Sequence, residues 1–200
     1  MIEGRARAVV DAVLPAVDGG RFRAKCIAGE PVRIEAHCFT DGHDRIAVAL
    51  RWQNVAAQEA YEVDMTAEVN DVWSAQFTPP VPGRYRYTVS AWVDHFESWR
   101  RELERRNDLA DIRVALTVGA ELIDAAAVRA GAEDAAVLAN WAAVLRSTAA
   151  DDSGLADVAA MQGLGLDPAK AAIMKRYQDR SLAASTTLEL TADRPRAQFS

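Results

Sequence analysis

The chain has 200 residues, half of them hydrophobic, and a formal net charge of -6 at pH 7. This length allows one large domain or two small ones. The acidic balance disfavours nucleic-acid binding, which requires clustered Lys and Arg, and no apolar run reaches the ~20 residues of a membrane helix. Because Cys26 and Cys38 are close in sequence, we expect two free thiols in a reducing cytoplasm rather than a disulfide between distant strands.

The first eighty residues predict a series of short strands. Apolar and polar residues alternate in four segments, and a more modest strand precedes them; the five ranges are 7–14, 32–39, 46–52, 61–65 and 73–77. An Asp-Gly turn separates the second from the third. Strands of this length at roughly ten-residue spacing, each with one apolar face, are typical of a β-sandwich.

The stretch 82–101 begins as a strand and continues as a helix. The apolar face of its strand contains Tyr85, Tyr87, Val89, Ala91 and Val93. From Phe96 the apolar spacing becomes helical, through Trp99 and Leu103. Asp94 occupies an N-cap position, and Glu97 follows three residues later, as in a capping box.

Several aromatic residues have a predicted place in the sandwich. Tyr85 or Tyr87 is a candidate for the corner tyrosine of an immunoglobulin-like sandwich. Trp52 and Trp73 share a face with core residues. Trp92 lies on the opposite face from Val89, so it faces solvent, lies under helices or meets a partner; we favour the last two, because inserted helices must pack on something. Trp99 is expected to anchor the first helix on the sandwich.

After residue 106 the sequence predicts helices, followed by a return to β structure. Four apolar stripes are expected. The first contains Ile112, Leu116, Gly119 and Ile123, and the second contains Val137, Trp141, either Val144 or Leu145, and Thr148. The third contains Leu155, Val158 and Met161, and the fourth contains Ile173, Tyr177 and Leu182. Gly163 and Gly165 are expected to end the third of these helices. Asp167 and Pro168 start the last one. Residues 185–191 then supply a seventh strand that completes the sandwich.

The predicted fold is therefore mixed β and α. It is an immunoglobulin-like antiparallel β-sandwich with an α-helical bundle inserted before its last strand. The sandwich covers residues 1–94 and is completed by 185–193, the bundle covers 95–184, and residues 194–200 begin a linker.

Reactive side chains do not form a recognisable catalytic motif. Asp41, His43 and Asp44 could bind a metal or act as acid and base, but a tight turn with solvated side chains explains them more simply. Asp94 beside His95 is better explained as a helix cap than as a catalytic dyad. Cys26 is expected to be a structural thiol. We therefore assign no catalytic, cofactor-binding or metal-binding residue.

A family resemblance is carried by many short runs taken together. They are Val17–Lys25, Gly29–Val32, Phe39–Asp44, Leu50–Trp52, Asn70–Trp73, Gly83–Tyr85, Tyr87–Val89, Ala91–Asp94, Phe96, Trp99–Arg100 and Arg194–Phe199. In these runs the sequence resembles the N-terminal region of bacterial α-1,4-glucan:maltose-1-phosphate maltosyltransferases, members of the α-amylase clan (glycoside hydrolase family 13). The Ala-rich helices match this region in position and character only.

The resemblance implies a sandwich with a helical insertion that precedes a catalytic (β/α)-barrel. The barrel would hold the two carboxylates of a retaining mechanism, about 5 Å apart, and would bind the α-glucan and maltose-1-phosphate. The sequence stops where such a barrel would begin, so no catalytic residue is transferred to it.

Three functional hypotheses follow from this resemblance and from the residues. The first is a cytoplasmic, non-catalytic accessory and dimerisation domain, without a cofactor and without nucleic-acid or membrane partners. The second is a free-standing carbohydrate-binding or protein-interaction module. The third is a small enzyme that uses Asp41, His43 and either Asp44 or Asp94. In the first hypothesis the candidate structural or interface residues are Trp92, Asp94, Phe96 and Trp99.

Overall fold

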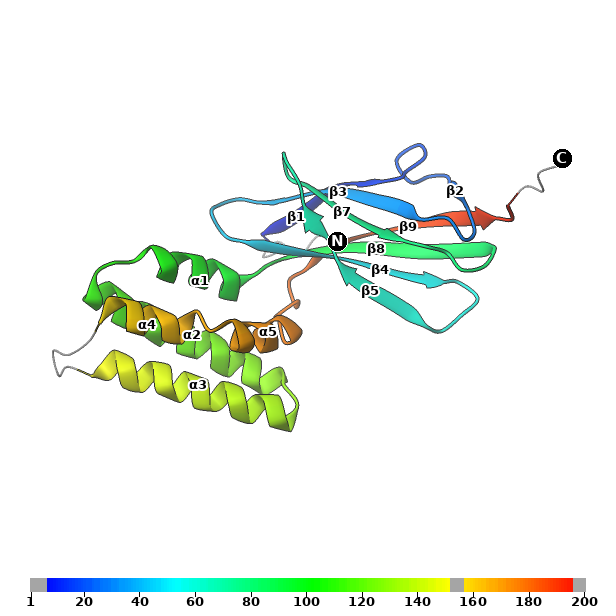
Figure 1. The fold of residues 1–200 in the computed structure, drawn as a ribbon. Coiled ribbons are helices and arrows are strands. Elements are labelled where there is room, and N and C mark those ends of the chain that lie inside the picture. The colour runs from blue at the N-terminus through cyan, green and yellow to red at the C-terminus, as the bar shows by residue number, and fades with distance from the viewer. Residues whose placement is uncertain (1–6, 152–156, 196–200) are drawn as a thin grey trace. The chain divides into compact units, whose positions relative to one another are not determined.

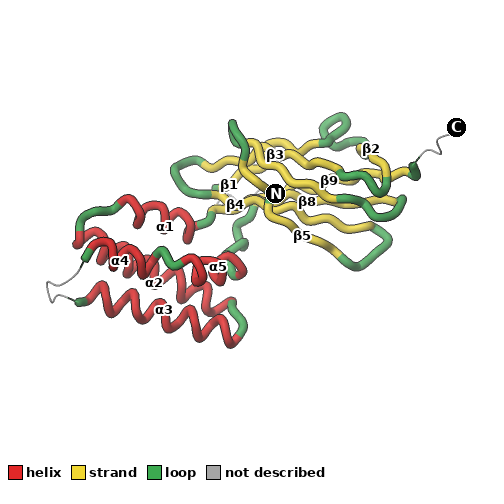
Figure 2. The backbone as a smooth tube through the Cα atoms, in the orientation of Figure 1, coloured by secondary structure: helices red, strands yellow, loops and turns green. Residues whose placement is uncertain are grey.

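The computed structural model describes residues 7–151 and 157–195, which form nine strands and five helices (Figure 1; Figure 2). The strands are β1 (Ala8–Leu14), β2 (Ala24–Ile27), β3 (Val32–Thr40), β4 (Ile46–Asn54), β5 (Ala60–Asp64), β6 (Thr66–Ala67), β7 (Val72–Phe77), β8 (Gly83–Val93) and β9 (Ala184–Asp193). The helices are α1 (His95–Arg105), α2 (Leu109–Arg129), α3 (Ala132–Ala150), α4 (Val158–Gly165) and α5 (Pro168–Arg176). The mixed β and α composition is thus confirmed.

The described residues divide into two compact units. The two-sheet unit contains all these strands and is built, among the described residues, from 7–42, 46–93 and 181–195. The helical unit contains the five helices together with residues 43–45. In sequence, the helices lie between β8 and β9, two strands that pair with each other from Gly83↔Ala192 to Ala91↔Ala184.

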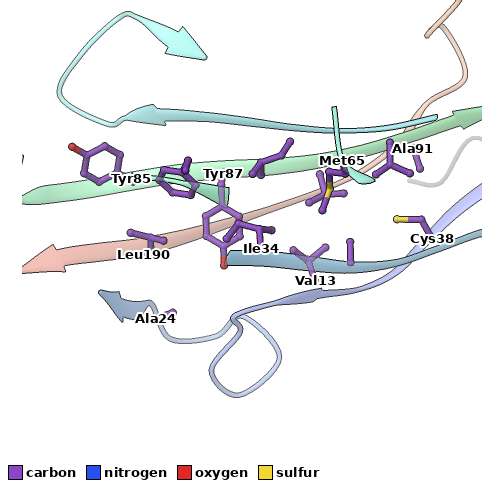
Figure 3. Packing of buried hydrophobic residues seen from close by; sticks show 14 of the residues in the cluster. Val13, Ala24, Ile34, Cys38, Met65, Tyr85, Tyr87, Ala91 and Leu190 are labelled. Carbon is purple, nitrogen blue, oxygen red and sulfur yellow. The ribbon is translucent and has the colours of Figure 1, made fainter. Parts of the chain in front are cut away.

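The two-sheet unit consists of one sheet with strand order β1-β3-β7-β6 and a second with order β2-β9-β8-β4-β5. Their inward faces share one hydrophobic core, to which Ile34 and Cys38 contribute from the first sheet and Tyr87 and Leu190 from the second (Figure 3). The alternation predicted along β8 is confirmed from Tyr85 to Ala91, where the alternate residues are buried, but Val93, which was expected on the same face, is only half-buried.

Strand β2 was not predicted, and it changes the expected topology. It pairs with β9 in parallel, from Ala24↔Leu190 to Ile27↔Asp193, so the unit is not antiparallel throughout. Strand β2 has four residues, and only Ala24 is buried. So short a segment shows too little alternation of apolar and polar residues to predict a strand from the sequence. Cys26 and Cys38 are both free thiols.

The helical unit has a core of its own, built on α2 and α3. The predicted stripe on α2 is confirmed, since all four of its residues from Ile112 to Ile123 are buried. On α3 the buried residues are Leu138, Trp141, Ala142 and Leu145. Of the alternatives Val144 and Leu145, the structure therefore buries Leu145, whereas Val137, which was also expected in this stripe, is exposed.

The last two helices differ from the prediction at their ends. Helix α4 includes Gly163 and ends with Gly165, so the first glycine does not stop it. Helix α5 starts at Pro168 behind an Asp167 cap, as predicted. It ends at Arg176, so Leu182 is outside the helix and exposed.

Some predictions lie outside the described residues. They concern Leu155 in the stripe expected to include Val158 and Met161, and most of the linker predicted at 194–200. Among the helices that the structure describes, none is long and apolar enough to cross a membrane.

Candidate functional site

The segment that leads from β8 into α1 is organised by Asp94. Its carboxylate accepts a hydrogen bond from the backbone N–H of Glu97 at 3.0 Å, as an N-cap does. Its carbonyl oxygen accepts from the Ser98 hydroxyl at 2.7 Å, and its own N–H donates to the carbonyl of Arg45 at 2.7 Å. The predicted capping role of Asp94 is therefore present in the geometry.

Asp94 also joins the start of the helical unit to the chain that leaves it. The second carboxylate oxygen accepts from the side-chain amide of Gln178 at 2.5 Å. Burial raises the pKa of Asp94 above its usual range, and the hydrogen bonds from Glu97 N–H and Gln178 act in the opposite direction. Both carboxylate oxygens of Asp94 thus accept hydrogen bonds from within the helical unit.

Phe96 and Trp99 belong to the aromatic core of the helical unit. The Phe96 ring lies 5.5 Å from Trp99 and meets Trp141 edge-on at 5.9 Å, centroid to centroid. The indole N–H of Trp99 donates to the carbonyl of Ala115 at 2.7 Å. Trp99 therefore holds α1 against α2. Its expected role as an anchor on the strands stays a prediction.

Trp92 is buried, with 2% of its surface exposed, although it lies on the outward face of the second sheet. Which of the three expected environments Trp92 has on this face, solvent, helices or a partner, stays a prediction. Further along the same face of β8, polar side chains pair with those of β9. The Ser90 and Ser185 hydroxyls are 2.8 Å apart, and the Thr88 and Thr187 hydroxyls are 2.9 Å apart.

Tyr85 has the hydrogen bond that defines a tyrosine corner. Its hydroxyl donates to the carbonyl of Val81, four residues upstream, at 2.9 Å. The neighbouring candidate, Tyr87, instead donates to the carbonyl of Pro15 at 2.5 Å, and burial raises the pKa of Tyr87 to about 12. Of the two tyrosines proposed from the sequence, Tyr85 therefore has the corner geometry.

The reactive cluster around residue 43 shows no developed site. Asp41 forms an exposed ion pair with Arg7 at 3.1 Å. Within residues 7–151 and 157–195, no group of three or more His, Cys, Asp or Glu side chains could hold a metal ion. Burial raises the pKa of the Cys38 thiol to about 12, and burial likewise raises that of Cys26. Neither thiol is poised as a nucleophile.

Sequence reasoning missed a stack of aromatic rings at the edge of the two-sheet unit. Tyr61 stacks on Trp52, and Trp52 stacks on Phe77. Trp52 was predicted as a core residue, and it does pack against the core, but Tyr61 on the edge strand β5 is about half exposed. Cross-strand pairing of two aromatic residues was the available signal, yet it depends on a register that the sequence does not specify.

Comparison with known proteins identifies the family. The family model described as α-1,4-glucan:maltose-1-phosphate maltosyltransferase, domain N/S, matches residues 6–194. A protein of that enzyme name from Chlorobaculum tepidum is 36% identical, covering 99% of this chain and 29% of the relative. One from Myxococcus xanthus is 35% identical, covering 100% of this chain and 30% of the relative.

A third relative of the same name, from Cereibacter sphaeroides, is 34% identical, covering 98% of this chain and 32% of the relative. The chain thus spans under a third of the length of each of these three proteins. The resemblance found in the sequence is confirmed, and the chain belongs to the α-1,4-glucan:maltose-1-phosphate maltosyltransferase family, where it corresponds to the N/S domain.

Proposed function

We propose that this chain is a non-catalytic N-terminal accessory domain of a glucan maltosyltransferase and that it contributes to self-association of the enzyme. The enzyme would be a cytoplasmic member of the α-amylase clan that transfers maltosyl units from maltose-1-phosphate to an α-1,4-glucan. The chain would supply an immunoglobulin-like β-sandwich and an inserted helical bundle, and a separate barrel would supply catalysis.

The observation that carries the proposal is the family match across residues 6–194. The environments of the residues first considered for catalysis support a structural role. Asp41 is paired with Arg7, and Asp94 caps a helix and binds Gln178. The Tyr85 corner supports the immunoglobulin-like classification.

The outward face of α2 supports a role in assembly. Its residues at spacings of three and four share one side of the helix, opposite the buried stripe; they are Val114, Val118, Glu121, Ala125 and Val128. Val128 is 87% exposed and Val114 is 64% exposed. A helix that is apolar on both sides is expected to be covered on both sides.

We assign this α2 face to a second copy of the same chain. Glu121 is its single ionisable group, so the face offers little that would select a charged partner. Two copies of one apolar face related by a two-fold axis are self-complementary, which is the commonest arrangement of homodimers. On α3, the apolar side chains of Val137 and Val144 are also exposed.

Sedimentation velocity of the chain over a range of concentrations tests this assignment. We expect a concentration-dependent dimer that Val118→Glu converts to a monomer, because the variant would bury a charge at the centre of the contact. Val69→Glu is the matched control, since Val69 is exposed in a loop of the two-sheet unit. A strict monomer, or a dimer unaffected by Val118→Glu, would contradict the assignment.

The non-catalytic part of the proposal has its own test. The chain is incubated with maltose-1-phosphate and a glucan acceptor, and released phosphate is measured. We expect no release above the rate without protein. Turnover that is lost in Asp41→Asn or His43→Ala would instead support the small-enzyme hypothesis.

A further inference from the structure

The edge strand β5 exposes side chains that point to the inner side of its sheet. Tyr61 and Val63 pair with Trp52 and Leu50, whose side chains face the core, yet Tyr61 is 49% exposed and Val63 is 36% exposed. Strand β5 ends its sheet (Figure 1). The other sheet ends at the two-residue strand β6. The inner side of β5 is therefore open to solvent at this edge.

Tyr61 is the outermost of three stacked rings. Its ring centroid lies 5.7 Å from that of Trp52, with an interplanar angle of 24°. Trp52 lies 5.1 Å from Phe77 at 22°, and Phe77 is buried. One face of Tyr61 thus rests on a ring that is fixed by the core, while about half of the residue meets solvent. A ring held in this way loses little conformational entropy when a ligand binds to it.

Polar groups accompany the exposed ring. The Tyr61 hydroxyl is hydrogen-bonded to the Glu59 carboxylate, and this bond raises the pKa of Tyr61. Glu59 is exposed and can accept further hydrogen bonds. An apolar surface with a few polar acceptors beside it suits a ligand with one apolar face and polar edges. The pyranose ring of glucose is such a ligand, with C–H groups on its faces and hydroxyls around its rim.

We propose that Tyr61, supported by Trp52, is a binding site for glucose residues of an α-1,4-glucan, with Glu59 accepting hydrogen bonds from their hydroxyls. This inference rests on the proposed function, which supplies the glucan as the ligand class. The site would be separate from any catalytic centre and would hold the polymer by a surface contact. No catalytic step takes place there.

Another exposed aromatic residue in the same unit provides a comparison. Phe22 is 58% exposed, more than Tyr61, but no aromatic ring is stacked beneath it among the described residues. The guanidinium of Arg21 instead lies over the Phe22 ring, 5.7 Å from its centroid. Phe22 is therefore at least as exposed as Tyr61, but its ring is not stacked on another aromatic ring and one of its faces is covered by Arg21.

Affinity electrophoresis in gels that contain glycogen, with calorimetric titration by maltoheptaose, tests the site on the 200-residue chain. We expect the chain to be retarded and Tyr61→Ala to raise the dissociation constant by about tenfold, the loss of one aromatic contact. Tyr61→Phe keeps the stack and is expected to retain most of the binding. Phe22→Ala is expected to bind as the unmodified chain does. Circular dichroism checks that each variant is folded.

Three results would overturn the proposal. They are no retardation of the unmodified chain, equal retardation of Tyr61→Ala, and a change of sedimentation in Tyr61→Ala with glucan binding unaltered. The last would make the edge a protein contact. These outcomes are separate from those for the accessory role, because Val118→Glu changes association through the helical unit and is expected to leave glycogen retardation unchanged.

Discussion

The indole of Trp99 occupies the space that a side chain at position 119 would need. A Cβ atom on Gly119 would lie 2.1 Å from Cζ2 of Trp99 and 2.5 Å from its Cε2. The same indole donates a hydrogen bond to the carbonyl of Ala115, one turn earlier on α2. The close approach of α1 to α2 therefore depends on a glycine at this position.

Gly119→Ala is expected to destabilise the helical unit by about 1–2 kcal/mol. Alanine gains up to about 1 kcal/mol of helix propensity over glycine, but the methyl group overlaps an aromatic ring, and such overpacking costs about 1–3 kcal/mol or more. The measurement is chemical denaturation followed by helical circular dichroism.

Gly163→Ala is the matched control for this change. Gly163 lies inside α4, and a Cβ atom there would meet nothing within 4 Å. The control should gain stability by up to about 1 kcal/mol. If both substitutions increased stability by the same amount, the packing of Trp99 would not require a glycine at position 119.

The long elements were predictable because their patterns are local. Tyr85, Tyr87 and Val89 alternate, and Phe96, Trp99 and Leu103 follow a helical stripe, and the structure buries all six. The partners of β9 are not local: Thr186 pairs with Val89 of a strand that ends before the helices begin. The β character of this segment was readable from its composition, which is why its return to the sheet was predicted.

Features that could not be predicted from the sequence are those that depend on where a residue lies in the fold. Tyr61 and Met65 follow the same alternating pattern, yet Met65 is buried and Tyr61 is half exposed, because β5 is an edge strand. Gly165 was expected to end α4 and does so, but a Cβ atom there would also lie 2.4 Å from Cδ2 of Leu103. The residue serves helix packing, and only the folded arrangement shows it. The same holds for the ring stack in the proposed glucan site.

We expect the Asp94 cap of α1 to contribute more to the free energy of unfolding than the Asp108 cap of α2. Asp94 and Asp108 both accept from backbone N–H groups in the first turn of a helix. Replacing such a cap by alanine costs about 1 kcal/mol. Asp94→Ala also leaves the Gln178 amide without its acceptor, so its loss should exceed that of Asp108→Ala by about 1 kcal/mol. Denaturation midpoints of the two variants measure the difference, and equal losses would contradict a structural role for the Gln178 contact.

The hydrogen bond of the Tyr85 hydroxyl predicts that Tyr85→Phe is modestly less stable than the unmodified chain. The variant keeps the buried ring and removes the hydroxyl that donates to the Val81 carbonyl. Because Val81 is about half exposed, water can replace part of the lost bond, and we expect a loss of about 1 kcal/mol. Thermal unfolding checks this value. Tyr61→Phe, which removes an exposed hydroxyl, should be nearly neutral, and a similar loss in both variants would contradict a special role for the corner.

Asp134 should make the helical unit less stable in acid. The Tyr177 hydroxyl donates to its carboxylate at 2.6 Å, and Arg176 donates to both carboxylate oxygens at 2.9 and 2.8 Å. The hydroxyl bond, followed by the charge of Arg176, holds the pKa of Asp134 below its usual range. The resulting stabilisation is fully present above the ordinary aspartate pKa of about 4 and is lost as the pH falls through the lower pKa of the folded state.

Asp134→Asn removes the titrating carboxyl, so the variant shows how much Asp134 contributes to the pH dependence of stability. At neutral pH the variant should be less stable than the unmodified chain, and the difference should shrink as the pH falls below about 4, where the unmodified carboxyl becomes protonated as well. Urea denaturation at a series of pH values measures both curves. Tyr177→Phe removes the hydroxyl alone and should reduce the pH-dependent difference without abolishing it, since Arg176 remains. Parallel curves for Asp134→Asn and the unmodified chain at every pH would show that the folded protein does not lower the pKa of Asp134.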